Sequence, residues 1–285
     1  MGALQGRTAL VTGVSRRRGI GYAVARALAA EGAHLVISHH RPHDVDQPWG
    51  ADDLDAVRSG IRRAQVEGAA FADIAADLAD PEAPARLISE AAAVTGSLDI
   101  LVANQARSGG DGSILDMTAD RLDGHWAVNA RATILLTAEF ARLAADPGDA
   151  AARPGDRRRG SIDEHAARRV FWMTSGQHDG PMPGEVAYAA SKAALAGLTA
   201  TVAAELLPLG VILNTINPGP VDTGYLEAEG ADRDPEVIAE ALAAMPMGRF
   251  GAPDDPARLI AWLAGDAGRW IVGQVLTSDG GFALR

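Results

Sequence analysis

The sequence predicts a doubly wound α/β fold in which helices cover both faces of a seven-stranded parallel sheet. Two observations lead to this fold class. Short apolar runs alternate with helical stretches along the 285 residues, and a glycine-rich turn joins the first apolar run to the first helical stretch. A chain of this length fits one α/β domain, so we expect residues 1–285 to form a single domain.

The expected strands are seven short apolar runs, and a helical stretch lies between each run and the next. The strands are Thr8–Thr12, Ala33–Ser38, Ala69–Ile74, Leu98–Ala103, Arg169–Thr174, Val211–Ile216 and Gln274–Thr277. The helices are Ile20–Glu31, Asp53–Glu67, Glu82–Thr95, Asp120–Ala145, Val186–Leu207 and Pro256–Gly265. Because crossover helices connect parallel strands, we expect the ligand at the carboxyl ends of the strands.

Two segments interrupt this alternation. Residues 146–168 are rich in Ala, Pro, Gly, Asp and Arg, and this composition predicts a polar surface insertion that supplies no core. Residues 224–250 follow the sixth strand and combine acidic residues with a short apolar helix, Val237–Met245. We expect residues 224–250 to form a lid over the substrate.

Composition excludes several classes of protein. A net charge of −11 argues against a nucleic-acid partner, because phosphate backbones attract clustered positive charge. The absence of cysteine excludes disulfides and thiolate metal sites, and His39, His40 and His43 lack the carboxylates of a defined metal motif. Glu205 and Pro208 interrupt the most apolar stretch, 193–213, so we expect a cytoplasmic protein without a membrane partner.

The first turn reads Thr12-Gly13-Val14-Ser15-Arg16-Arg17-Arg18-Gly19-Ile20-Gly21. Glycine lets the backbone approach a pyrophosphate closely, and a helix N-terminus offers unpaired N–H groups and partial positive charge. Glycines also serve ordinary tight turns. The position of these glycines between a strand and a helix favours a dinucleotide site of the Rossmann type.

A second group of residues comprises Ser175, Tyr188 and Lys192. Tyr188 and Lys192 are four residues apart on an expected helix and therefore share a face. A free tyrosine has a pKa near 10, and a nearby ammonium stabilises the phenolate and makes proton transfer feasible at neutral pH. Such a pair is common on helix surfaces, but the chain has only three tyrosines, and Lys192 is its single lysine. With Ser175 at the end of the fifth strand, the group indicates a catalytic site.

Together these motifs resemble those of the classical short-chain dehydrogenase/reductases, the 3-oxoacyl-ACP reductases among them, over nearly the whole chain. Ser175 lies thirteen residues before Tyr188, and Tyr188 and Lys192 form the Tyr-x-x-x-Lys pattern. The other matching elements are the glycine turn, Asp77, Asn104, Asn129, Asn217-Pro218-Gly219 and Thr277-Ser278-Asp279-Gly280-Gly281.

The resemblance implies a role for each catalytic residue. Tyr188 is the implied general acid in reduction, and Ser175 the residue that holds the carbonyl oxygen. Lys192 is expected to bind the nicotinamide ribose hydroxyls and to lower the pKa of Tyr188. Asn129 is expected to hold a water that relays protons from Lys192, although it could also be an ordinary helix-surface amide.

The resemblance also implies a cofactor site. Asp77 is expected to contact adenine, Asn104 to support the cofactor, and Val221 and Thr223 to face the carboxamide and pyrophosphate; Asp77 could instead be a simple turn residue. The full expected set is Gly13, Ser15, Arg18, Gly19, Ile20, Gly21, His39, Arg41, Asp77, Leu78, Asn104, Tyr188, Lys192, Pro218, Gly219, Val221 and Thr223.

The sequence departs from the family pattern in two places near the cofactor. Five residues rather than three separate Gly13 from Gly19, which leaves the geometry of the phosphate loop open. The usual Asn-Ala-Gly reads Asn104-Gln105-Ala106, so Gln105 is expected to add bulk beside the cofactor. The long loop also resembles that of enoyl reductases, but those place six residues between tyrosine and lysine. The three found here favour carbonyl chemistry.

These observations predict an NAD(P)-dependent oxidoreductase that interconverts a ketone and a secondary alcohol, with a 3-oxoacyl thioester as one candidate substrate. The alternatives are a sugar or polyketide alcohol dehydrogenase and a non-catalytic dinucleotide sensor. A sensor needs none of Ser175, Tyr188 and Lys192, which counts against it.

Two further expectations concern the cofactor and the assembly. The second strand is followed by His39, His40 and Arg41 rather than by an acid, and the glycine turn adds three arginines. This charge pattern favours NADP(H) over NAD(H). Small apolar residues on 120–145 and 186–207, the helices that the family pairs across subunits, predict a homo-oligomer, specifically a tetramer.

Overall fold

The computed structural model describes residues 2–145, 165, 167–226 and 235–284. Seven parallel strands form one sheet in the order β3-β2-β1-β4-β5-β6-β7, so the predicted fold class is confirmed. The strands are β1 (Thr8–Val11), β2 (His34–His39), β3 (Phe71–Ala75), β4 (Ile100–Ala103), β5 (Arg168–Met173), β6 (Val211–Asn217) and β7 (Val275–Thr277).

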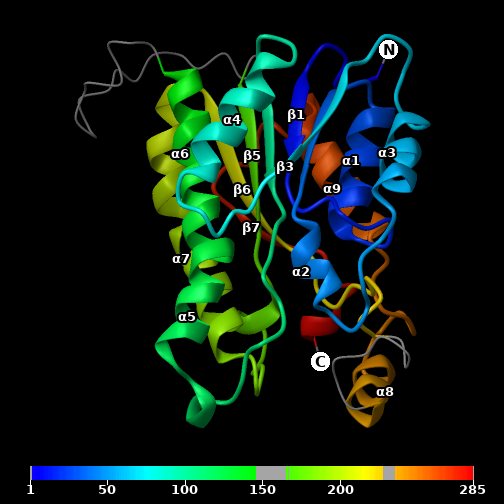
Figure 1. Ribbon diagram of the computed structural model, residues 1–285, viewed down its shortest axis with the longest axis vertical. Helices are drawn as coiled ribbons and strands as arrows, with labels where there is room; N and C mark the ends of the chain where they lie inside the picture. The colour runs from blue at the N-terminus through cyan, green and yellow to red at the C-terminus, as the bar shows by residue number, and fades with distance from the viewer. Residues whose placement is uncertain (1, 146–164, 166, 227–234, 285) are drawn as a thin grey trace.

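Helices cover both faces of this sheet (Figure 1). On one face lie α1 (Ile20–Ala30), α3 (Leu54–Arg62) and α9 (Asp254–Ala264). On the other lie α4 (Ala83–Ala93), α5 (Ala119–His125), α6 (Ala132–Ala144) and α7 (Val186–Leu206). Two short helices lie beyond the carboxyl ends of the strands: α2 (Arg41–Val45), where a loop was expected, and α8 (Pro235–Ala243).

Strand residues alternate between two hydrophobic clusters. Val11 and Phe171 pack toward α1 and α9, whereas Leu10 and Trp172 pack toward α4, α6 and α7. The central strands are therefore buried on both faces, which explains why they appear in the sequence as continuous apolar runs. β1 pairs with both β2 and β4, so the chain changes direction across the sheet at this point. In open parallel sheets, ligands bind at the carboxyl ends of the strands beside such a point.

The long helix expected over residues 120–145 is divided by a π-helical turn. The turn covers Trp126–Arg131 and joins α5 to α6. Its wider winding buries the side chain of Asn129 completely, while Trp126 remains 44% exposed. The prediction of one regular helix was wrong here, because hydrophobic spacing does not reveal one wide turn inside a helix.

Helix α7 with its following 3₁₀ turn, Val186–Leu209, is long and apolar enough to span a membrane by length and composition alone. In this fold it packs against β5 and β6, and Leu195, Ala203 and Leu206 belong to the hydrophobic core. Packing against the sheet therefore accounts for the apolar residues on the buried face of this helix.

The two segments that interrupt the predicted alternation are described in part. Residues 146–164 and 166 of the expected insertion, and 227–234 of the expected lid, lie outside the described residues. Arg168, the last residue of that expected insertion, is the first residue of β5, and Ala167 before it is buried. Helix α8 begins two residues earlier than the apolar helix expected from the sequence.

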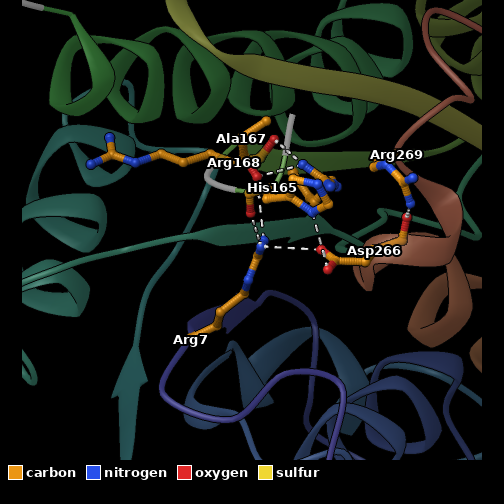
Figure 2. Close-up of polar contacts among 7 residues, drawn as sticks. Arg7, His165, Ala167, Arg168, Asp266 and Arg269 are labelled. Atoms are coloured by element: carbon orange, nitrogen blue, oxygen red, sulfur yellow. Dashed lines mark hydrogen bonds and ion pairs between the residues drawn. The ribbon is translucent and has the colours of Figure 1, made fainter. Parts of the chain in front are cut away.

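The amino ends of the strands carry a basic cluster that ties distant segments together (Figure 2). Arg7 donates to the His165 carbonyl at 2.5 Å and lies 3.9 Å from Asp266, while His165 Nδ1 lies 3.3 Å from Asp266. Arg169 is fully buried beside them and donates to the Ala167 carbonyl; burial, and then the charge of Arg7, lowers its pKa to about 10. This structural cluster lies at the edge opposite the expected ligand site.

Candidate active site

The ends of β5 and the start of α7 bring Ser175, Tyr188 and Lys192 together. Ser175 lies two residues after β5, and Tyr188 is the third residue of α7. The side chains of Ser175 and Tyr188 are hydrogen-bonded, and Lys192 Nζ lies 5.7 Å from the centroid of the Tyr188 ring. The structure thus assembles the three residues that the sequence singled out.

The single lysine is buried, with 2% of its surface exposed. Its Nζ donates to the Met173 carbonyl at 2.9 Å, and the Thr174 hydroxyl donates to the Lys192 carbonyl at 2.9 Å. Desolvation by burial lowers the pKa of Lys192 to about 8. The end of β5 therefore holds this amine beside Tyr188.

Desolvation is also the largest influence on the pKa of Tyr188. Burial raises the pKa of its phenol, and the hydrogen bond with Ser175 acts in the opposite direction but is the smaller effect. Lowering of this pKa by Lys192 was expected, but in this structure the pKa lies above its ordinary value. Tyr188 is therefore protonated at neutral pH, the state that a proton donor requires.

Asn129 connects the π turn to α7. Its Oδ1 accepts from the Arg107 amide at 2.7 Å, and its Nδ2 donates to the Arg107 carbonyl at 3.1 Å and to Ser191 Oγ at 3.0 Å. Ser191 Oγ in turn donates to the Tyr188 carbonyl at 2.7 Å. The alternative interpretation as a helix-surface amide is therefore wrong.

Gly13 and Gly21 of the glycine turn lie so close to the segment after β4 that a side chain would not fit at either position. A Cβ on Gly13, whose φ is +70°, would lie 2.8 Å from Gln105 Cα, and one on Gly21 would lie 2.6 Å from Asn104 Nδ2. Asn104 Nδ2 donates to the Thr12 and Gly13 carbonyls at 3.0 and 3.2 Å. Helix α1 starts at Ile20 without a side-chain cap, which leaves its N-terminus suited to an anion such as a pyrophosphate.

The three arginines of the glycine turn each meet a carboxylate. The distances are 3.3 Å from Arg16 to Asp44, 2.7 Å from Arg17 to Asp52 and 3.4 Å from Arg18 to Asp222. The hydrogen bond from Arg17 lowers the pKa of Asp52 to about 2. The acidic partners come from α2 and from two loops further along the chain, so the spacing of residues in the sequence did not reveal them.

The end of β2 and the start of α2 carry one buried histidine and one exposed arginine. His39 is buried with its Nε2 3.2 Å from Asp73, which also accepts from Arg58 at 2.6 Å. Arg41 is exposed at the start of α2. It lines a surface hollow of about 380 Å³ together with residues of the following segment: Ala51, Asp52, Asp53, Leu54, Asp55 and Arg58.

Gln105 does not crowd the cofactor side, so that expectation was wrong. Its side chain is 7% exposed and turns into the protein, where Nε2 donates to Thr133 Oγ1 at 2.9 Å and Oε1 accepts from the Thr12 hydroxyl. Gln105 therefore fastens the end of β4 to the π turn and α6. The sequence did not reveal the inward orientation of Gln105, because its hydrogen-bond partners Thr12 and Thr133 lie far from it along the chain.

The remaining expected cofactor residues line the carboxyl ends of β3 and β6. Asp77 accepts from the Ala79 amide at 2.9 Å and lies 4.0 Å from His40, and Leu78 is buried. Val221 is also buried, and the Thr223 carbonyl accepts from Arg16 at 2.9 Å. Gly219 has a φ of +65°, and a Cβ there would lie 2.5 Å from Asp279 Cβ, while Ser15 and Pro218 are half-buried in their loops.

Within the described residues, no three His, Asp or Glu side chains gather as ligands for a metal ion.

Comparison with known proteins agrees with this geometry. The family model for short chain dehydrogenase matches residues 7–234. An uncharacterized oxidoreductase YjdA of Bacillus subtilis is 36% identical over 280 residues, covering 98% of this chain and 97% of the relative.

Solved structures extend the likeness to three dimensions. A short-chain dehydrogenase/reductase from Serratia marcescens is 33% identical with a TM-score of 0.78 over 99% of each chain. A putative 2-deoxy-d-gluconate 3-dehydrogenase from Agrobacterium tumefaciens, solved with bound NADP, is 26% identical with a TM-score of 0.77, covering 99% of this chain and 98% of that one. Such enzymes use NAD(P)(H) and act on small molecules, and the chain described here belongs to the short-chain dehydrogenase/reductase family.

Proposed function

We propose that the protein reduces a ketone to a secondary alcohol, or catalyses the reverse reaction, on a small molecule in the cytoplasm. The observation that carries this proposal is the contact between Ser175 and Tyr188 with Lys192 buried beside them at the carboxyl edge of the sheet. The glycine turn and the uncapped start of α1 support a dinucleotide at the same edge.

The cofactor, when bound, supplies or accepts a hydride at the substrate carbon. The protonated Tyr188 phenol then donates its proton to the carbonyl oxygen as that oxygen gains negative charge. Ser175 hydrogen-bonds the same oxygen and holds it in place. Lys192 would hold the ribose hydroxyls of the cofactor and would supply positive charge near the phenol, and Asn129 would support a proton path from Lys192.

A screen of reduced-cofactor oxidation against ketones, sugars and 3-oxoacyl thioesters tests the proposal. We expect turnover with at least one ketone. A protein that binds the reduced cofactor tightly yet oxidises it with no member of the panel would instead support the non-catalytic sensor. A strong preference for a sugar or polyketide substrate in the oxidative direction would support the alcohol dehydrogenase alternative.

For the cofactor we propose NADP(H) in preference to NAD(H). β2 ends in His39 and is followed directly by His40 and Arg41 rather than by an acid, and Arg41 is exposed there. The carboxylates of Asp52, Asp53 and Asp55 line the same hollow further along the chain, and Asp52 is paired with Arg17. The carboxylates on Arg16, Arg17 and Arg18 and the burial of His39 leave Arg41 as the residue most open to this phosphate. The related Agrobacterium structure contains NADP, which agrees with the proposal.

Fluorescence titration with both reduced cofactors measures this preference. We expect NADPH to bind more tightly than NADH, and Arg41→Asp to weaken NADPH binding about tenfold or more through loss of a charge-assisted hydrogen bond. Arg63→Asp, at an exposed arginine beyond the end of α3, should leave both affinities unchanged. Tighter binding of NADH by the wild-type protein would contradict the proposal.

We further propose that the protein is a homotetramer assembled in part through α5 and α7. A surface hollow of about 300 Å³ opens between these helices, lined by Leu122, Asp123, Trp126, Ala187, Ala190 and Ser191. Leu122 is 41% exposed, and contact with a second subunit would remove this apolar surface from water.

Sedimentation tests the assembly. Leu122→Arg should shift the protein to smaller species, because it places a charge in the buried interface. Val66→Arg changes a residue of similar exposure (38%) beyond α3 and should leave the assembly intact. A wild-type monomer at micromolar concentration would exclude the tetramer.

A further inference from the structure

We propose that Asp111 is a positioning residue: it caps α7 from outside the helix and thereby holds Tyr188 in place for proton transfer. The inference rests on the proposed function, because its consequence for turnover requires Tyr188 to be the proton donor. Asp111 lies in the loop between β4 and α5, 77 residues before Tyr188 in the sequence.

The start of α7 lacks a cap of its own. The first backbone N–H groups of a helix have no acceptor within the helix, and Glu185, at the capping position, makes no side-chain hydrogen bond to them. The loop after β4 supplies the acceptors instead. Asp111 Oδ1 accepts from the Ala187 amide at 3.0 Å and Oδ2 from the Tyr188 amide at 2.7 Å, while the Gly112 carbonyl accepts from the Val186 amide at 3.4 Å.

Both oxygens of one carboxylate therefore bind two successive amides, the second of which belongs to the catalytic tyrosine. A negative charge at this point also interacts favourably with the positive end of the helix dipole. The contact joins segments that are distant in sequence, so it can orient α7 relative to β4 and not merely stabilise a helical turn.

The loop that carries Asp111 is fixed at its other end. Asn129 holds both the amide and the carbonyl of Arg107, and Asn129 also binds Ser191, whose hydroxyl donates to the Tyr188 carbonyl. The amide of Tyr188 is thus held by Asp111, and its carbonyl is reached through Ser191. The backbone of the catalytic tyrosine is clamped from both sides by one loop and the π turn.

Loss of the cap should act on Tyr188 and spare Lys192. Lys192 lies one turn further along α7, and the Met173 carbonyl and the Thr174 hydroxyl hold it independently. Beyond it, Leu195, Ala203 and Leu206 anchor the helix in the core. Fraying of the first turn would therefore displace the phenol from Ser175 without removing the amine that faces the cofactor.

The experiment measures kcat, cofactor affinity and amide hydrogen exchange in Asp111→Ala. We expect kcat to fall about 10- to 100-fold, the scale of a misplaced catalytic group, with the Kd of the reduced cofactor unchanged and faster exchange at Ala187 and Tyr188. Asp111→Asn keeps one acceptor oxygen, so it should recover part of both kcat and protection. It also serves as the test if Asp111→Ala does not fold.

Asp116→Ala is the matched control. Asp116 lies in the same loop, is exposed, and closes a capping box on a 3₁₀ turn (Ile114–Asp116) that carries no proposed catalytic residue. It should keep wild-type kcat.

An equal loss of kcat in Asp116→Ala, or faster exchange in Asp111→Ala with kcat unchanged, would overturn the positioning role. If the wild-type protein showed no turnover, the proposed function would fail and the positioning role with it, whereas exchange at Ala187 and Tyr188 would still report separately on the cap.

Discussion

Replacement of Tyr188 by phenylalanine is expected to lower kcat by at least about a hundredfold, the contribution of general acid catalysis, while the reduced cofactor still binds. The variant removes only the hydroxyl that meets Ser175, and the ring beside Lys192 remains. Turnover of a verified ketone substrate and cofactor titration measure the two effects.

Tyr22→Phe is the control for this experiment. Tyr22 is a buried tyrosine of α1 that packs against Gly60 on α3, away from the proposed catalytic group. Its variant should retain normal turnover. Near-normal reduction by Tyr188→Phe would remove Tyr188 as the proton donor.

The second large effect is expected at Lys192. Lys192→Met keeps an unbranched apolar side chain but removes the ammonium, so we expect kcat to fall by about two orders of magnitude or more, as for loss of an electrostatic catalytic group. We expect weaker cofactor binding as well. This joint loss distinguishes Lys192 from Tyr188, whose variant loses turnover alone. Unaltered cofactor affinity in Lys192→Met would contradict its role in ribose binding.

The same variant provides a pH test in the cofactor-free protein. The pKa of Lys192 is about 8 in the folded state and 10.5 in the unfolded reference, so the unfolded chain binds more protons between these values. The burial cost is therefore fully present below pH 8 and disappears as the pH rises toward 10.5. Relative to Lys192→Met, the free energy of unfolding of the wild type should rise by up to about 3 kcal/mol over this window.

Denaturant unfolding of both proteins at pH 7 and pH 10 gives this difference, in which the other titrating groups cancel. The lost hydrogen bond to Met173 adds only an offset that does not depend on pH. A difference in unfolding free energy that stays constant with pH would show that the folded protein does not perturb Lys192.

Local patterns in the sequence were sufficient for the fold and for the core of the candidate site. The alternation of apolar runs and helical stretches predicted the seven parallel strands, because each buried strand is apolar on both faces. The spacing of Tyr188 and Lys192 on one helix predicted their contact. Both predictions depend only on residues that are close together in the sequence.

Features that depend on distant contacts could not be predicted. The carboxylates that meet Arg16 and Arg17 lie after β2, and Asp111 reaches α7 across more than seventy residues. The inward turn of Gln105 depends on Thr12 and Thr133, and no local pattern marks a side chain that points away from the ligand. The π turn that buries Asn129 was hidden for a similar reason, since apolar spacing tolerates one wide turn.

The burial of the single lysine has a practical consequence for chemical labelling. Reagents that acylate primary amines find one side-chain target in this protein, and that target is 2% exposed beside Tyr188. The surface cations are guanidinium groups, which such reagents leave untouched. The rate of side-chain acylation therefore measures how often the interior around Lys192 opens to the reagent. The protein can also be attached to a support through its α-amino group without modification of this site.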